Sequence, residues 1–253
     1  MTFEPTISPA GTGDESDETP AALRSDHHAD VSGGWLRPAV FGAMDGLVTN
    51  IALIAGVGGG GVSPDNIVLT GVAGLVAGAI SMGLGEYTSV RSQNEQVAAE
   101  VAKERRELER NPEVEAQELA ELWVRRGLPR ELAEQLTAAL RNNPEETLRM
   151  HVREELGVDP DEQPSPWAAA ISSFGFFSVG ALVPLLTYLL GFTSLWLALS
   201  VGGLGLFITG AIVARFTNRP WWMSGLRQLL LGAAAAAATY VIGVMIGVQG
   251  GLG

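Results

Sequence analysis

Hydrophobic residues are concentrated in five long runs that polar segments separate. The runs cover residues 38–62, 66–90, 167–190, 191–214 and 228–249. An α-helix rises about 1.5 Å per residue, so each run is long enough to cross the roughly 30 Å of hydrocarbon in a membrane. A buried core helix is the alternative for any one run, but five runs in one chain favour membrane spans. The pattern therefore predicts an all-α membrane protein with five transmembrane helices.

Between the second and third runs the pattern changes to charged, amphipathic segments. Helix-ending residues recur there at Asn111-Pro112, 127–129 and 142–144. We therefore expect three or four helices that form a cytosolic, carboxylate-rich metal-binding domain inserted between helices 2 and 3. The expected parts are an acidic, disordered tail at 1–34, helices 1 and 2 at 35–90, the cytosolic domain at 91–164 and helices 3–5 at 165–253.

The positions of Lys and Arg predict the orientation. Both are absent from the loops 58–64 and 191–194, whereas they precede the first run, recur through 91–153 and lie between the fourth and fifth runs. Cytosolic loops are enriched in these residues. We therefore expect a cytosolic N-terminus and insert, and a C-terminus outside or in a lumen.

Composition narrows the function classes. Hydrophobic residues make up 47% of the chain, charged residues 17%, and there are 32 glycines and no cysteine. The absence of cysteine excludes disulfides and thiolate metal sites. A net charge of -12 argues against nucleic acid and favours cations as partners. The glycine pairs 56/60, 74/78 and 243/247 have the spacing that allows close helix packing.

Two runs each contain one carboxylate, Asp45 and Glu86. A charge among lipid tails is costly and usually lines a path for a cation or proton. Thr49 lies one turn after Asp45, and Met82 lies one turn before Glu86. Arg91, farther along, is a candidate neighbour of Glu86.

Asp45 and Met82 are expected at a similar depth, roughly 12 to 14 Å from the cytosolic interface. Carboxylate oxygen with thioether sulfur suits Fe(II) better than Mg(II) or Ca(II). The alternative is that Met82 serves packing alone. His27-His28, in the N-terminal tail, could also bind metal, but a solvated tail is the simpler interpretation.

Acidic residues recur at helical spacing in the insert. They form the sets Glu100, Glu104 and Glu107; Glu115, Glu118 and Glu121; and His151 with Glu155. Helical bundles assemble iron and manganese sites from such faces. The alternative is a solvated surface on which these Glu residues pair with Lys103, Arg105, Arg106 and Arg110.

Several motifs resemble the vacuolar iron transporter family. They are FGAMDGLVTNIALIAGV at 41–57, AGAISMGLGEYTSVRSQNE at 77–95, EELGVDP at 154–160 and SPWAAAISSFGFFSVGALVPLL at 165–186. The resemblance covers nearly everything after residue 35. It implies a homodimer of five-helix protomers that exports chiefly Fe(II), with Mn(II), Co(II) or Zn(II) as further substrates, from the cytosol in exchange for protons.

The resemblance also implies the ligands. Asp45 and Met82 would bind metal in the membrane, with Glu86 at the inner mouth of the path. In the domain the ligands would be Glu104, Glu107, Glu115, Glu118 and Glu155, with His151 where some members have Met. The metal is substrate and domain ligand, and no prosthetic group is implied. The membrane would be the plasma membrane in a prokaryote and the vacuolar membrane in a eukaryote.

The runner-up function is a membrane-anchored iron buffer or sensor that uses the carboxylate-rich domain. Asp45 separates the two hypotheses, because an anchor has no use for an intramembrane acid. An enzyme is not expected, since the chain contains no P-loop, HExxH or G-x-S-x-G motif.

Overall fold

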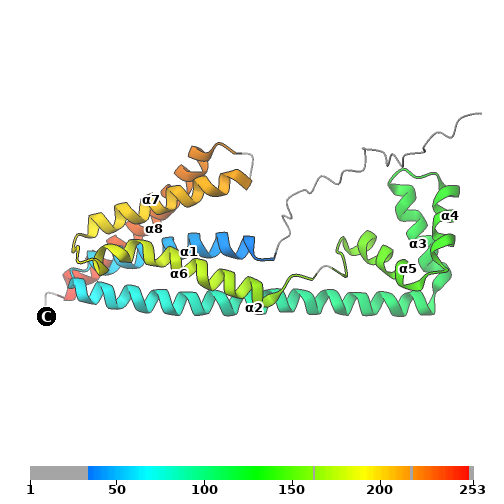
Figure 1. Cartoon of the computed structure of the whole chain (residues 1–253), viewed down its shortest axis with the longest axis horizontal. Helices are drawn as coiled ribbons and strands as arrows, with labels where there is room; N and C mark the ends of the chain where they lie inside the picture. The colour runs from blue at the N-terminus through cyan, green and yellow to red at the C-terminus, as the bar shows by residue number, and fades with distance from the viewer. Residues whose placement is uncertain (1–33, 162, 217–218, 251–253) are drawn as a thin grey trace, which may run out of the picture. The chain divides into compact units, whose positions relative to one another are not determined.

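The computed structural model describes residues 34–161, 163–216 and 219–250, and the regular structure in these residues is entirely helical (Figure 1). Five helices are long and apolar enough to span a membrane. They are α1 (Leu36–Gly59), α2 (Pro64–Arg110), α6 (Pro166–Leu189), α7 (Leu195–Val213) and α8 (Trp221–Gly250). The predicted fold class is confirmed. Residues 1–33, which include His27-His28 and nearly all of the predicted tail, lie outside the described residues.

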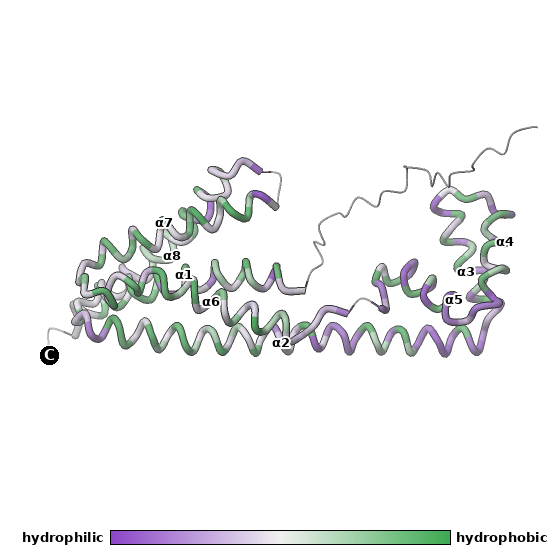
Figure 2. Tube along the Cα trace, in the orientation of Figure 1, coloured by the Kyte–Doolittle hydropathy of each residue, from purple (hydrophilic) through white to green (hydrophobic). Residues whose placement is uncertain are grey.

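Helix α2 continues 20 residues beyond the end of the predicted second run, from Val90 to Arg110. Figure 2 shows it changing from hydrophobic to hydrophilic along its length. Neither Gly nor Pro occurs between Glu86 and Asn111, so nothing in this stretch interrupts a helix rich in Glu, Ala and Arg. The helix ends where Asn111 precedes a proline. The predicted boundary at residue 90 therefore falls inside a continuous helix.

The rest of the insert forms short helices that are separated at the predicted breaks. They are α3 (Pro112–Arg125), α4 (Arg130–Leu140) and α5 (Pro144–His151), followed by a π-helical turn, η2 (Val152–Leu156). Proline occupies the first position of α3 and α5, where its missing N–H is tolerated. The Asn143 side chain caps α5 by accepting a hydrogen bond from the Glu146 N–H at 3.3 Å.

Helices α7 and α8 begin several residues away from the starts of the hydrophobic runs that predicted them. Helix α7 starts at Leu195 instead of 191, because Gly191 adopts a φ of +89° and Ser194 caps the new helix. Helix α8 starts at Trp221, seven residues before the fifth run. A short 3-10 turn, η3 (Ala214–Phe216), follows α7.

Helix α1 is central to the spanning helices, since it packs against α2, α6, α7 and α8. Glycine permits the closest approaches. A Cβ at Gly46 would overlap the carbonyl oxygen of Phe177 in α6, and a Cβ at Gly243 in α8 would overlap that of Gly56. A Cβ at Gly247 would lie 2.6 Å from the carbonyl oxygen of Gly60. The glycine pairs 56/60 and 243/247 are therefore part of the close contact between α1 and α8.

Candidate metal centre

A carboxylate and histidine cluster forms where side chains from α2, α3, α5 and η2 meet. One ligand atom from each of four residues lies within 4.8 Å of the others, and these residues are Glu104, Glu115, His151 and Glu155. The Nδ1 atom of His151 lies 3.1 Å from Glu104 Oε1, 3.6 Å from Glu155 Oε1 and 3.9 Å from Glu115 Oε2. Three carboxylates and one imidazole are a donor set that suits Fe(II), Mn(II), Co(II) or Zn(II).

Local structure explains how the four side chains meet. Glu104 lies near the end of α2, and Glu115 lies in the first turn of α3. The chain changes direction at Asn111, between the two helices, and this brings the two side chains close together. His151 ends α5. The π-helical turn that follows holds Glu155 and ends at Gly157, whose φ is +66°. Single π turns occur frequently at functional sites.

Three of the four residues are buried and Glu155 is exposed, and several of the buried polar atoms lack partners. His151 is 0% exposed, Glu115 7% and Glu104 8%. Both ring nitrogens of His151 and Oε1 of Glu104 have no hydrogen-bond partner among the described residues. Buried polar groups are nearly always hydrogen-bonded, so such atoms that face one another need an explanation. A cation bound between His151 Nδ1 and the carboxylates would supply it for the atoms that face one another.

The electrostatics of Glu104 lead to the same interpretation. Burial, followed by the charges of Glu155, Glu115, Glu107 and Glu118, raises its pKa to about 7. Ionising this carboxylate next to the others is therefore unfavourable unless a positive charge is present. A divalent ion would reverse the effect, because metal ligands bind in their deprotonated form.

The other cluster members follow the same pattern. Burial is the first cause that raises the pKa of Glu115 and of Glu155, with nearby carboxylates adding to it. Burial lowers the pKa of His151, which favours the neutral imidazole that binds metals. Lys103 partly offsets the repulsion at Glu155 by lowering its pKa.

Glu107 and Glu118, also predicted as ligands, lie near the four-residue group but outside it. Their charges raise the pKa of Glu104, Glu115 and Glu155. Glu107 is half-buried and Glu118 exposed. Their place in the site is therefore electrostatic in this structure, and their role as ligands stays a prediction.

Part of the predicted acidic pattern belongs to the solvated surface instead. Glu100 is exposed, and Glu121 forms an ion pair with Arg130 at 2.8 Å. Arg105 pairs with Glu145 at 2.6 Å across the domain. The surface interpretation therefore describes these residues, while the inward residues of the same helices form the cluster.

In the membrane, Asp45 is half-buried on α1 and accepts a hydrogen bond from Thr49 Oγ1 at 3.2 Å. The expected polar face of α1 is therefore present. Met82, on α2, is partly buried and packs against Ala79, Phe177 and Ala181. This contact accords with packing, and the role of Met82 as a metal ligand stays a prediction.

Glu86 is half-buried on α2, one turn beyond Met82. Arg91 does not pair with it. Instead, Arg91 forms an ion pair with Glu95 at 2.8 Å and donates a hydrogen bond to the Tyr87 hydroxyl. Arg91 prefers Glu95 because the two lie one turn apart on the exposed face of the helix.

Sequence reasoning missed Asn50, which is 1% exposed inside the spanning helices. Its amide donates a hydrogen bond to the carbonyl oxygen of Ala181 in α6, near the helix-internal Pro184. The signal was an amide side chain directly after Thr49 in a largely apolar stretch of α1.

Comparison with known proteins bears on the whole chain. The VIT family profile matches residues 36–244. A protein named vacuolar iron transporter 1 from Arabidopsis thaliana is 32% identical over 230 residues, which cover 87% of this chain and 91% of that protein. The rice protein of the same name is 34% identical, with coverage of 87% and 90%.

The similarity extends beyond plants. A vacuolar iron transporter from Acanthamoeba castellanii is 35% identical over 238 residues, which cover 88% of this chain and 84% of that protein. The resemblance inferred from the motifs is confirmed, as is the expectation of a membrane transporter instead of an enzyme. The chain belongs to the VIT family.

Proposed function

We propose that this protein exports Fe(II) from the cytosol across a membrane in exchange for protons. Family membership and the names of its relatives support iron as the substrate. The observation that carries the proposal is the largely buried cluster in which the carboxylates of Glu104, Glu115 and Glu155 converge on His151. Such a cluster needs a divalent metal to be electrostatically favourable.

The proposed path begins at this cluster and continues to the membrane. Helix α2 links the two regions, because it contains Glu104 and, 18 residues earlier, Glu86. That separation is about 27 Å along a helix. Glu86 would receive the ion at the inner mouth, and Asp45 with Met82 would bind it within the membrane. Protonation of Asp45 or Glu86 would then drive release and couple metal export to proton entry.

The donor atoms favour late first-row divalent metals. Oxygen and imidazole ligands suit Fe(II), Mn(II), Co(II) and Zn(II), whereas Mg(II) prefers oxygen alone and keeps much of its water. We therefore propose the other three metals as secondary substrates. Glu107 and Glu118 would attract the ion and complete its coordination during loading.

The proposed orientation follows the distribution of positive charge. The N-terminus and the domain at 91–164 would lie in the cytosol, and the C-terminus outside or in a lumen. The membrane would be the plasma membrane in a prokaryote and the vacuolar membrane in a eukaryote. Two protomers would form a homodimer that shields the polar faces of α1 and α2 from lipid.

The alternative proposal is a membrane-anchored iron buffer or sensor. It is favoured by one observation, namely that the cluster is assembled entirely from the insert and the end of α2. Such a protein would bind iron without moving it. Asp45 again separates the hypotheses, because only a transporter needs a half-buried carboxylate in a membrane span.

Iron flux into liposomes tests the proposal. The full chain is reconstituted, Fe(II) is added without oxygen, and a trapped fluorescent chelator reports its entry. The wild type should admit Fe(II), and Asp45→Ala and Asp45→Asn should lose nearly all flux. Asp65→Asn is the matched control, because Asp65 is exposed in the first turn of α2, at the edge of the apolar run. Wild-type binding of Fe(II) without flux would establish the buffer instead.

A further inference from the structure

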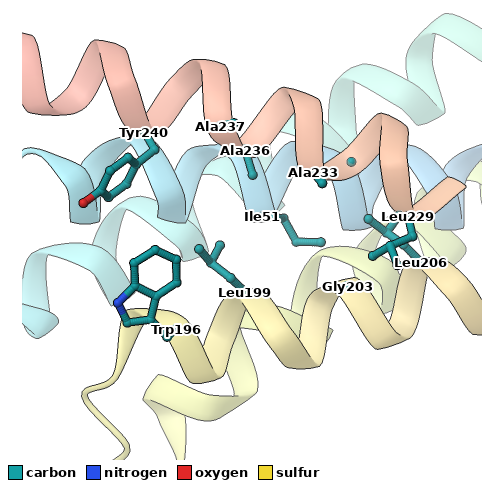
Figure 3. A pocket seen from close by; sticks show the side chains of 11 residues that line it. Ile51, Trp196, Leu199, Gly203, Leu206, Leu229, Ala233, Ala236, Ala237 and Tyr240 are labelled. Carbon is teal, nitrogen blue, oxygen red and sulfur yellow. The ribbon is translucent and has the colours of Figure 1, made fainter. Parts of the chain in front are cut away.

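A pocket of about 290 Å³ lies between α1, α7 and α8 (Figure 3). Ile51 and Leu206, both nearly fully buried, form part of its lining. Between Leu229 and Tyr240 the lining contributed by α8 is glycine and alanine, among them Ala233 and Ala237. The pocket exists because this part of α8 has no side chain large enough to fill the space beside α7.

The polar atoms of the two lining aromatic residues lie at one end of the pocket. Figure 3 shows the Trp196 nitrogen and the Tyr240 hydroxyl at the same end, away from Leu206 and Leu229. The two rings are 6.2 Å apart between centroids. Every other side chain that lines the pocket is apolar or a glycine.

That end of the pocket lies near the end of α1 and the start of α7, where a membrane interface is expected. Trp196 is the second residue of α7, which follows the short turn after α6. Tyr240 lies beside the end of α1, because a Cβ at Gly59 would be 2.7 Å from the Tyr240 carbonyl oxygen. Trp and Tyr are enriched at this level of membrane proteins, where apolar rings meet polar lipid groups.

The surroundings narrow the possible occupants. Only 11% of the most apolar stretch of α8 is buried against the rest of the chain. Most of this stretch therefore faces the membrane or another chain. Water is disfavoured in a pocket with so few polar groups, and an empty pocket forfeits dispersion contacts. A helix of a second copy is about 10 to 12 Å across and too wide for this volume. A single hydrocarbon chain is narrow enough.

We propose that this pocket binds one acyl chain of a membrane phospholipid. The chain lies along Ala233 and Ala237 toward Leu229. The glycerol ester region lies at the interface, where the Trp196 N–H and Tyr240 O–H donate hydrogen bonds to its carbonyl oxygens. Ile51 belongs to the same helix as Asp45, so a lipid in the pocket would contact α1 directly. Its binding would not depend on transport.

Filling the pocket tests this proposal. Ala233→Leu with Ala237→Leu adds volume at two exposed positions one turn apart, so the helix itself should tolerate the change. Ala234→Leu with Ala238→Leu is the matched control, because both residues are exposed on the same helix and neither lines the pocket. The Ala237→Leu variant alone gives the same comparison with less added volume.

Palmitoyl-oleoyl phosphatidylcholine is added to each delipidated full-length protein, and bound lipid is counted by native mass spectrometry. Wild type and control should retain one tightly bound lipid per chain, and the filled variant should bind it at least about tenfold more weakly. Added lipid should also raise the melting temperature of the first two proteins and not of the third. Equal lipid retention in all proteins would overturn the proposal. So would loss of a dimer in the filled variant with lipid binding unchanged, since a second copy would then occupy the pocket.

Discussion

At the scale of single residues, the site depends on groups whose surroundings change their chemistry. From the sequence alone, Glu104 would be expected to have the pKa of an ordinary carboxylate. Burial and four neighbouring acids raise that pKa to about 7. Spacing placed these residues on shared helix faces and left a solvated surface as the alternative, and the family resemblance implied Glu104, Glu115, His151 and Glu155 as ligands. Spacing could not predict that the faces of different helices would meet at one point, because that depends on the chain turning at Asn111 and on the π-helical turn after His151.

The metal-free protein is expected to become less stable as pH rises from about 4.5 to about 7. Between the unfolded pKa of Glu104 and its raised folded pKa, the folded state holds more protons, so the free energy of unfolding falls with rising pH. Glu115 and Glu155 act in the same direction. His151 has the opposite effect on stability, because burial lowers its pKa and its protonation below pH 6.5 favours the unfolded state. It is one group against three carboxylates.

Thermal melting followed by circular dichroism, with a chelator present, measures this dependence. Glu104→Gln should flatten the pH profile, because the amide cannot ionise. The exposed Glu100→Gln serves as the control and should leave the profile unchanged. A wild-type protein that becomes more stable between pH 5 and 7 would show that the carboxylates are not close together in solution.

Met82→Leu should reduce Fe(II) flux more than Mn(II) flux. Leucine keeps the packing against Phe177 and Ala181 but removes the sulfur, and Mn(II) depends less on soft ligands. The ratio of the two fluxes is measured in one liposome preparation, so differences in protein content cancel. An unchanged ratio would mean that Met82 serves packing alone.

At the scale of elements, the hydrophobic runs predicted all five spans, and the Asn-Pro and Gly-containing breaks predicted the short helices. The continuation of α2 to Arg110 was not predicted, because a change from apolar to charged residues alters which solvent a helix faces without ending it. The glycine pairs were too common to identify a contact from sequence. Their partners became evident only when α8 was seen to pack against α1.

Gly243→Ala should destabilise the spanning helices. The added methyl group would overlap the backbone carbonyl of Gly56, which cannot move aside without separating α1 from α8. Gly175→Ala is the control, because its Cβ would meet nothing within 4 Å. Melting in detergent should show a lower transition temperature for the first variant only. Equal transition temperatures would mean that α1 and α8 pack less closely than described.

At the scale of the whole molecule, metal binding should stabilise the protein. An ion that binds only the folded state at 100 times its dissociation constant adds about 2.7 kcal/mol to the free energy of unfolding. Fe(II), Mn(II), Co(II) and Zn(II) should raise the melting temperature of the full chain, and Mg(II) much less. The effect should weaken as pH falls below about 7, where protons compete at Glu104.

The combined variant Glu104→Gln with Glu115→Gln tests the source of this stabilisation. It should melt higher than wild type without metal, because it relieves like-charge repulsion, and should lose the response to Fe(II). The control is Glu100→Gln with Glu131→Gln, at exposed positions outside the cluster. If the cluster variant still responds to Fe(II) as the wild type does, the metal binds elsewhere.

The central claim is that Fe(II) leaves the cytosol in exchange for protons, and metal-dependent proton flux tests it most directly. Liposomes that contain the full chain and a trapped pH indicator receive an inward Fe(II) gradient without oxygen. The account predicts that protons leave as Fe(II) enters, that Asp45→Asn abolishes both fluxes, and that the cluster variant slows both without ending them. Fe(II) entry with no accompanying proton movement would contradict the exchange, and wild-type proton movement that is independent of metal would contradict the coupling.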